Sequence, residues 1–138
     1  MKNNDFVDAR DDNGTMPHNV EELSDALVGH KIVSIERGEK IKRYGIEKTP
    51  LVLTLDNGSK VRVKNTYDCC AYTELEDIVI SNLDDLTHMI TGVVSSDGYE
   101  TWHILADFGE VMQLKVGWSS GNPFYYSYGF EIDVEHID

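Results

Sequence analysis

The second half of the sequence contains almost no positive charge. Of the 12 Lys and Arg residues, only Lys115 lies after residue 64, whereas 14 of the 25 Asp and Glu residues lie there. The net charge of −13 therefore comes from residues 65–138. Because phosphate groups are neutralised by Lys and Arg, this half is not expected to bind nucleic acid directly. Clustered negative charge instead attracts a positively charged partner over a distance.

Cysteine, proline and long apolar runs are also scarce. The sequence has three prolines and two cysteines, Cys69 and Cys70, which are adjacent. Neighbouring cysteines close only a strained ring, so reduced thiols are expected. No apolar run approaches the roughly 18 residues of a membrane span, and the N-terminus lacks the charged-then-apolar order of a secretory signal. With 41% apolar residues, the sequence predicts a folded protein of the cytoplasm.

The domain organisation predicted from these patterns is simple. Residues 1–17 are polar and show no apolar period, so they are expected to form a flexible acidic arm. Residues 18–138 have the length of one globular domain. Residues 38–49 are predicted to form a surface loop that offsets acidic charge, with phosphate binding as the alternative; its basic residues are Lys40, Lys42, Arg43 and Lys48.

A short helix is predicted at the start of the globular domain. Asn19 is the expected N-cap, and Glu22 lies three residues later, as in a capping box. Residues 20–28 then place apolar side chains on one face, and Gly29 is suited to end the helix. Residues 31–37 follow as a first strand.

A hairpin is the clearest local prediction. Residues 51–55 and 61–63 alternate apolar with polar side chains, and Asp56-Asn57-Gly58 supplies the turn. Residues 73–80 fit either a helix or an extended link; a helix is favoured because Leu75, Ile78 and Val79 then share a face.

The C-terminal part is predicted to be an antiparallel meander. Its strands are expected at residues 89–95, 101–106 and 111–118, followed by a long strand within the alternating run 124–135. The whole chain is thus predicted to be an α+β domain, in which one or two short helices cover a strongly twisted, mainly antiparallel sheet or partly closed barrel of about seven strands. An all-β sandwich is the alternative.

One motif carries a resemblance to a known family. The stretch Asp68-Cys69-Cys70-Ala71-Tyr72, preceded by the Leu-Thr-Leu-Asp-Asn-Gly hairpin, resembles a family of uncharacterised small bacteriophage proteins, a domain of unknown function. Residues 25–36 and the aromatic stretch 121–130 extend the resemblance. It implies a phage origin and brings no established activity.

The adjacent cysteines allow several interpretations. One thiol can pack as a small apolar group while the other is partly exposed. Metal binding would need further ligands, which His88 and His103 could supply, although adjacent cysteines are awkward compared with Cys-x-x-Cys spacing. A nucleophilic thiolate is disfavoured because the neighbouring residues are acidic. No metal, cofactor or catalytic set is therefore expected.

The preferred function is a non-enzymatic phage protein that binds a basic host protein, with imitation of nucleic-acid charge as one version. The acidic binding residues would be Glu74, Glu76, Asp77, Asp84 and Asp85, and Trp118 and Tyr125 would be exposed aromatic contacts. The alternative is a small-ligand or metal-binding domain, with catalysis as one version, around Asp68, Cys69, Cys70 and His103. In a third interpretation, the acidity only confers solubility. The sequence identifies neither a partner nor an oligomeric state, and it leaves open whether the thiols react.

Overall fold

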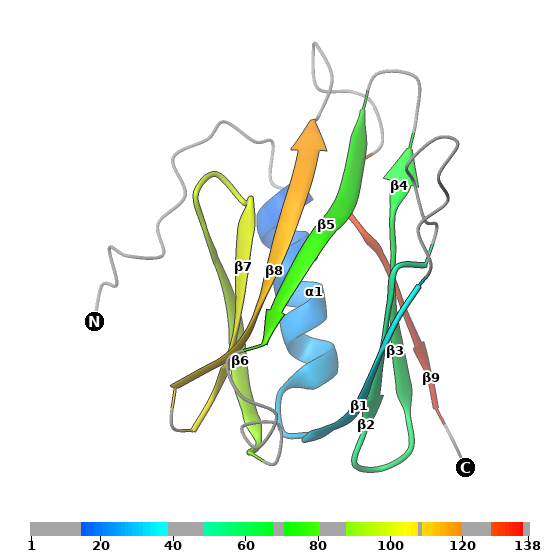
Figure 1. The fold of residues 1–138 in the computed structure, drawn as a ribbon, viewed down its shortest axis with the longest axis vertical. Helices are drawn as coiled ribbons and strands as arrows, with labels where there is room; N and C mark the ends of the chain where they lie inside the picture. Colours follow the sequence, from blue (N-terminus) through cyan, green and yellow to red (C-terminus); the bar gives the residue numbers. More distant parts are fainter. Residues whose placement is uncertain are drawn as a thin grey trace.

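The computed structural model describes residues 15–38, 49–67, 71–80, 88–107, 109–119 and 128–136. This part of the chain contains one helix and nine strands (Figure 1). In chain order they are α1 (Thr15–Leu27), β1 (Ile32–Arg37), β2 (Leu51–Leu55), β3 (Lys60–Lys64), β4 (Thr66–Tyr67), β5 (Tyr72–Ile80), β6 (Ile90–Ser96), β7 (Thr101–Ala106), β8 (Gly109–Ser119) and β9 (Glu131–Glu135). The predicted α+β class is confirmed in outline, with nine strands in the described ranges rather than about seven.

The strands form two antiparallel sheets. The first sheet has the order β1-β2-β3-β9, and the second sheet, which curls, has the order β4-β5-β8-β7-β6 (Figure 1). Only Asn65 separates β3 from β4, so one stretch of chain passes from the first sheet into the second. Asn65 is buried, and its Oδ1 accepts a hydrogen bond of 2.9 Å from the Leu75 N–H of β5. A side chain therefore replaces a backbone partner at the point where the two sheets join.

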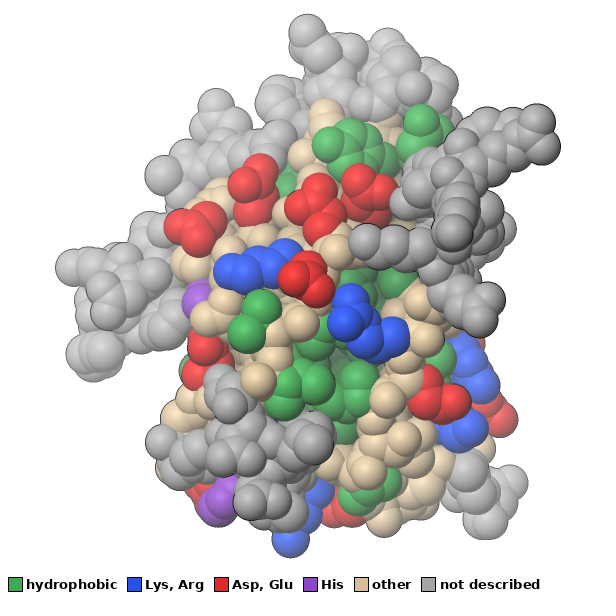
Figure 2. All heavy atoms as spheres, in the orientation of Figure 1, with side chains coloured by type: hydrophobic (Ala, Val, Ile, Leu, Met, Phe, Trp, Pro, Cys, Tyr) green, Lys and Arg blue, Asp and Glu red, His purple; other side chains and the backbone are tan. Residues whose placement is uncertain are grey.

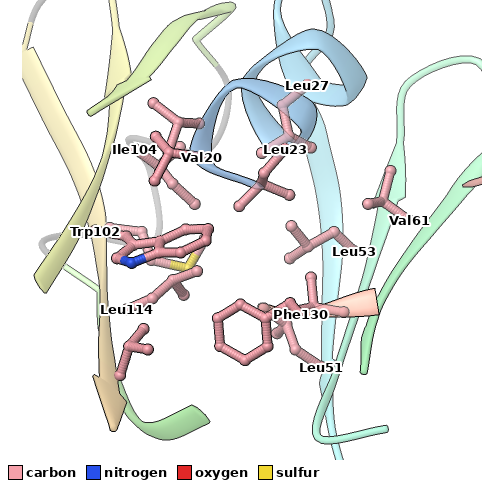
Figure 3. Packing of buried hydrophobic residues seen from close by; sticks show 14 of the residues in the cluster. Val20, Leu23, Leu27, Leu51, Leu53, Val61, Trp102, Ile104, Leu114 and Phe130 are labelled. Atoms are coloured by element: carbon pink, nitrogen blue, oxygen red, sulfur yellow. The ribbon is translucent and has the colours of Figure 1, made fainter. Parts of the chain in front are cut away.

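The hydrophobic core lies between the two sheets and α1. Figure 3 shows side chains of α1, β2 and β7 pointing into the same interior. Trp102 is fully buried and meets Phe130 edge to face, with ring centroids 5.2 Å apart and an interplanar angle of 80°. The helix contributes buried residues at positions that recur every three or four residues, namely Met16, Val20, Leu23 and Leu27.

Helix α1 begins earlier than the sequence indicated. Met16 is 0% exposed, so the apolar face extends into the range assigned to the arm, and residues 15–17 are helical; residues 1–14 lie outside the described part. Asn19 is not the N-cap. It lies inside the helix, where its Nδ2–H donates to the Phe130 carbonyl at 2.9 Å and its Oδ1 accepts from the Phe130 N–H at 2.8 Å. Asn19 thus ties α1 to the segment before β9.

The predicted helix at residues 73–80 is wrong, because this segment is strand β5. Its register with β8 shifts between Leu75 and Asp77, as in a β-bulge that adds one residue to the strand. Leu75 packs against the core and Ile78 is buried within it. The extra residue therefore places two inward side chains three positions apart, the spacing that suggested a helix.

The hairpin and most of the meander are confirmed. β2 pairs with β3, and β6, β7 and β8 pair consecutively. The final strand is shorter than predicted: β9 begins at Glu131, while residues 120–127 lie outside the described part. Gly129 has a φ of +96°, a conformation that L side chains rarely adopt, so the alternating run cannot continue through it as one strand. The basic residues within 39–48 also lie outside the described ranges.

Candidate functional site

The second sheet presents an outer face, opposite α1, on which side chains from four strands form rows. Pairing in register places Ser96 beside Thr101 and Thr101 beside Lys115. Lys115 in turn lies beside Asp77 of β5. The neighbouring row contains Val94, His103, Gln113 and Val79. We call the face carrying these eight residues the outer face.

An acidic hollow of about 620 Å³ opens at one end of this face. Acidic side chains gather over the same region in Figure 2. The hollow is lined by Tyr72, Glu76, Asp97, Glu100, Thr101, Lys115, Val116, Gly117 and Trp118. Among these described lining residues, three are carboxylates and Lys115 is the single cation, so the hollow is net negative.

The turn between β6 and β7 forms one wall of the acidic hollow. Asp97, Gly98 and Tyr99 all have positive φ, with values of 57°, 66° and 65°. Such a backbone is costly for residues other than glycine and persists only where the surroundings hold it. Two indoles do so, because Trp118 Nε1–H donates to the Gly98 carbonyl at 2.7 Å and Trp102 Nε1–H donates to the Tyr99 carbonyl at 2.9 Å. This wall is therefore preformed.

Trp118 is buried, and its predicted role as an exposed contact is wrong. The residue is 2% exposed and stacks on Tyr128, with ring centroids 5.6 Å apart and an interplanar angle of 14°. Tyr99 meets its edge at 6.0 Å. Alternation along β8 puts Trp118 on the same side as Met112 and Leu114, which is the core side. Tyr125 lies outside the described residues.

Glu76 lines the acidic hollow, and Glu74 lies on the same strand opposite Gly117, another lining residue. A Cβ added at Gly117 would lie 2.4 Å from Glu76 Oε2, so the glycine leaves room for that carboxylate. Burial raises the pKa of the Glu74 carboxyl above its ordinary value, and the nearby charge of Glu76 raises that pKa further. Negative charge is therefore already crowded there.

The remaining predicted acidic residues are distributed differently. Asp77 on β5 faces Arg37 of β1, with Nη2 and Oδ1 3.3 Å apart, so a basic residue from the first half of the chain partly offsets its charge. Asp84 and Asp85 lie outside the described part, as do the motif residues Asp68, Cys69 and Cys70. Tyr72, the last residue of the motif, begins β5 and lines the acidic hollow.

The acids of β9, by contrast, lie against bases of β3. In-register pairs bring Lys60 to Glu135, Arg62 to Asp133 and Lys64 to Glu131. Diagonal ion pairs join Arg62 Nη2 to Glu135 Oε1 at 2.6 Å and Lys64 Nζ to Asp133 Oδ2 at 3.8 Å. At the first sheet, basic residues from the first half of the sequence thus offset acidic residues from the second half.

A hydrogen-bonded chain of three side chains lies on the outer face beside the acidic hollow. Ser96 Oγ and His103 Nε2 are 2.7 Å apart, and His103 Nδ1 contacts Glu110 Oε1. Gln113 Nε2–H donates to the other Glu110 oxygen at 2.8 Å. His103 lies on the face opposite Trp102. The sequence indicated a role for His103 only in a small-ligand or metal site with the cysteines, and it did not point to Ser96 or Glu110.

A second β-bulge explains why Glu110 was missed. The register of β7 with β8 shifts between Ile104 and Leu105, so that Val111 and Met112 are both buried. Strict alternation along residues 111–118 would instead have directed Val111 outward together with Gln113. The shift also brings Glu110 and Gln113, three positions apart, to the same side of the strand, where the two side chains are hydrogen-bonded.

No set of three or more His, Cys, Asp or Glu side chains suited to a metal ion occurs among the described residues. His88 instead lies beside Asp107, with Nδ1 and Oδ1 3.0 Å apart. Within the described ranges, no helix combines the length and apolar character needed to cross a membrane.

Comparison with known proteins identifies a family but no characterised relative. The family described as DUF7448, a domain of unknown function, matches residues 25–132. Comparison with curated proteins and with solved structures gives no match. The matched range runs from within α1 to within β9, so it includes both the acidic hollow and the Ser96–His103–Glu110 chain. The match names neither an activity nor a source, and phage origin stays a prediction. The chain belongs to the DUF7448 family.

Proposed function

We propose that the protein binds a positively charged segment of a partner protein on the outer face of the second sheet, and that the acidic hollow receives a Lys or Arg side chain of that segment. The observation that carries this proposal is the lining of the hollow, in which Glu76, Asp97 and Glu100 surround Lys115. The partner is a basic protein; a phage origin would make it a host protein.

Local electrostatics favour a cationic guest over an anionic one. The raised pKa of Glu74 means that its ionised form is disfavoured by burial and by the charge of Glu76. A bound ammonium or guanidinium would relieve that repulsion, whereas a bound carboxylate or phosphate would increase it. The ion pairs of β9 with β3 leave this end of the second sheet as the stronger source of negative potential among the described surfaces.

The acidic hollow is also suited to binding because its wall needs little ordering. The two tryptophan indoles hold the turn that carries Asp97, and Thr101 Oγ1–H donates to Asp97 Oδ2 at 3.1 Å. A preorganised site loses less conformational entropy when it binds a ligand. The charged groups mainly accelerate association, because exposed ion pairs contribute only about 0.2–1 kcal/mol each.

The test measures binding kinetics of a short oligo-arginine peptide, and of any basic protein recovered by affinity pull-down. The double variant Glu76→Gln and Glu100→Gln should slow association by about tenfold at low salt and flatten its salt dependence. The matched control is Glu36→Gln with Glu131→Gln, which removes the same charge from exposed positions of the first sheet. That control should change association much less.

Two results would contradict this proposal. In one, both double variants slow association equally, so that only the net charge matters. In the other, the peptide binds with the same rate at low and high salt. Either result would make the acidity a solubility feature rather than a recognition site.

A further inference from the structure

In the Ser96–His103–Glu110 chain, a serine hydroxyl is hydrogen-bonded to an imidazole, and the imidazole is hydrogen-bonded to a carboxylate. This is the arrangement that activates a serine as a nucleophile. An ionised carboxylate only accepts hydrogen bonds, so Glu110 Oε1 accepts a hydrogen bond from His103 Nδ1–H, and the ring proton stays on Nδ1. The other ring nitrogen, Nε2, then carries a lone pair and accepts from the Ser96 hydroxyl at 2.7 Å. A nucleophile bonded to a base that is oriented by a third group is the arrangement on which covalent acyl transfer depends.

The supporting residues hold this arrangement in place. Gln113 Nε2–H donates to Glu110 Oε2 at 2.8 Å, which fixes the carboxylate plane toward the imidazole. Exposure decreases along the chain, from 29% for the Glu110 side chain to 12% for that of His103 and 8% for Ser96 as a whole. Limited contact with water strengthens such hydrogen bonds.

We infer that Ser96 is the nucleophile of an acyl-transfer site that hydrolyses short-chain carboxylic esters, with His103 as general base and Glu110 as the residue that orients it. This inference does not require the proposed partner binding, although Lys115 takes part in both. It rests on the geometry of the three side chains, whereas partner binding rests on the charge of the neighbouring hollow.

The surroundings of Ser96 define the substrate class. Val94 pairs with His103 from the adjacent strand β6, and Leu105 follows His103 by two residues on β7; both are half-buried and offer a small apolar surface for a short acyl chain. On the other side, Thr101 separates Ser96 from Lys115 in one row of the sheet. Strand spacing puts the Cα atoms of Ser96 and Lys115 on the order of 10 Å apart, so the long Lys115 side chain can direct its ammonium toward the carbonyl oxygen of an ester at Ser96. A cation there stabilises negative charge that develops on that oxygen.

The reaction balances with water as the only co-substrate. Ser96 Oγ attacks the ester carbonyl carbon while its proton passes to His103 Nε2. The bond between the carbonyl carbon and the alcohol oxygen then breaks, and the alcohol leaves with that proton. Water next gives a proton to Nε2 and attacks the acyl group on Ser96. The Oγ–acyl bond breaks, the proton returns to Ser96, and a carboxylic acid is released.

The test treats the full chain with a fluorophosphonate probe and, separately, with p-nitrophenyl acetate. Mass spectrometry should locate the phosphonyl group on Ser96. Ser96→Ala and His103→Gln should each lower the rate of ester hydrolysis by about 100-fold or more. Glu110→Gln keeps the shape of the side chain and should also lower the rate.

The controls separate this site from general reactivity and from misfolding. Ser34→Ala and His18→Gln change residues that are exposed elsewhere, and both variants should hydrolyse the ester like the parent chain. Ser96→Cys retains a side chain of similar shape and should keep the parent melting temperature while losing fluorophosphonate labelling. Ser96→Ala should still bind oligo-arginine, so loss of one property does not imply loss of the other. The inference is overturned if folded Ser96→Ala hydrolyses the ester at the parent rate, or if the probe labels other serines as readily as Ser96.

Discussion

At the scale of single residues, Glu74 shows how an acidic side chain can lower the stability of the fold. Its carboxyl lies on a sheet face where burial and Glu76 both disfavour the ionised form. A neutral or apolar residue at this position would serve the fold better. The packing of β5 therefore gives no reason for a charge at this position, whereas the proposed cation-binding face would give one.

Replacing Glu74 by Gln should stabilise the protein at neutral pH. Because the folded-state pKa of Glu74 is raised, this carboxyl stabilises the fold below its unfolded pKa, and that stabilisation is lost as pH rises through the folded pKa. Solvent screening limits the gain in unfolding free energy for Glu74→Gln to less than about 1 kcal/mol. Thermal melting between neutral pH and about pH 4, near the ordinary pKa of Glu, should show the gain shrink on acidification.

The control for this prediction is Glu36→Gln on β1, an exposed glutamate of the first sheet. Its melting temperature should follow that of the parent chain across the same pH range. A gain for Glu74→Gln that stays constant with pH would mean that the substitution acts through side-chain packing rather than through ionisation.

At the scale of elements, local patterns predicted regular strands well and irregular ones poorly. The β2–β3 hairpin could be predicted because strict alternation and the Asp56-Asn57-Gly58 turn agree. β5 could not, because its bulge shifts the inward residues from a spacing of two to a spacing of three. The bulge of β8 hid Glu110 for the same reason. A β-bulge of one residue cannot be recognised from the amino-acid composition of a strand. The position of Glu110 beside His103 therefore becomes visible only when the strand pairing is known.

Asn19 is a similar case in a helix, because the local sequence pattern around it did not predict its role. Its position before an apolar run and three residues before Glu22 fits a capping box, but the 3.3 Å contact from Asn19 Nδ2 to Glu22 Oε1 joins two side chains, whereas a capping box joins side chains to backbone N–H groups. The helix continues upstream, because Met16 adds buried area. The partner of Asn19 is Phe130, 111 residues away in the chain, which no local pattern reveals.

Gly129 provides a prediction at this scale. It interrupts the alternating aromatic run and directly precedes Phe130, whose backbone is hydrogen-bonded to the Asn19 side chain. Its φ of +96° lies in the region that L side chains rarely adopt. Gly129→Ala should lower the free energy of unfolding by about 1–2 kcal/mol, the usual cost of a left-handed backbone for an L-residue. Gly92→Ala in β6 is the matched control. Gly92 lacks a positive φ, and an added Cβ would meet nothing within 4 Å.

Urea unfolding of both variants checks this prediction, with the midpoint and slope compared with those of the parent chain. Equal stability of Gly129→Ala and the parent would mean that the segment before β9 relaxes without cost. In that case the hydrogen bonds between Asn19 and Phe130 would not be strong enough to keep residue 129 in its left-handed conformation.

At the scale of the whole molecule, the fold brings together opposite charges that are far apart in the sequence. The sequence divides into a balanced half and an acidic half, but the fold sets bases of β3 against acids of β9 and Arg37 of β1 against Asp77 of β5. The first sheet is therefore nearly self-compensating, and negative potential remains concentrated at the acidic hollow of the second sheet. Composition predicted that an acidic surface exists; tertiary pairing determines where it lies.

The β3–β9 pairing gives a charge-reversal test of this arrangement. Arg62 Nη2 lies 2.6 Å from Glu135 Oε1, and Asp133 faces Arg62 in register. Arg62→Glu places like charges across the two strands and should lower the free energy of unfolding by about 1 kcal/mol. Adding Glu135→Arg should restore part of that loss, because the ion pair re-forms with its signs exchanged. The coupling energy of this double-mutant cycle should fall in about 1 M salt, where the Debye length is about 3 Å.

If the loss from Arg62→Glu is the same at low and high salt, and Glu135→Arg restores none of it, then packing of the Arg62 stem rather than charge joins β9 to the first sheet.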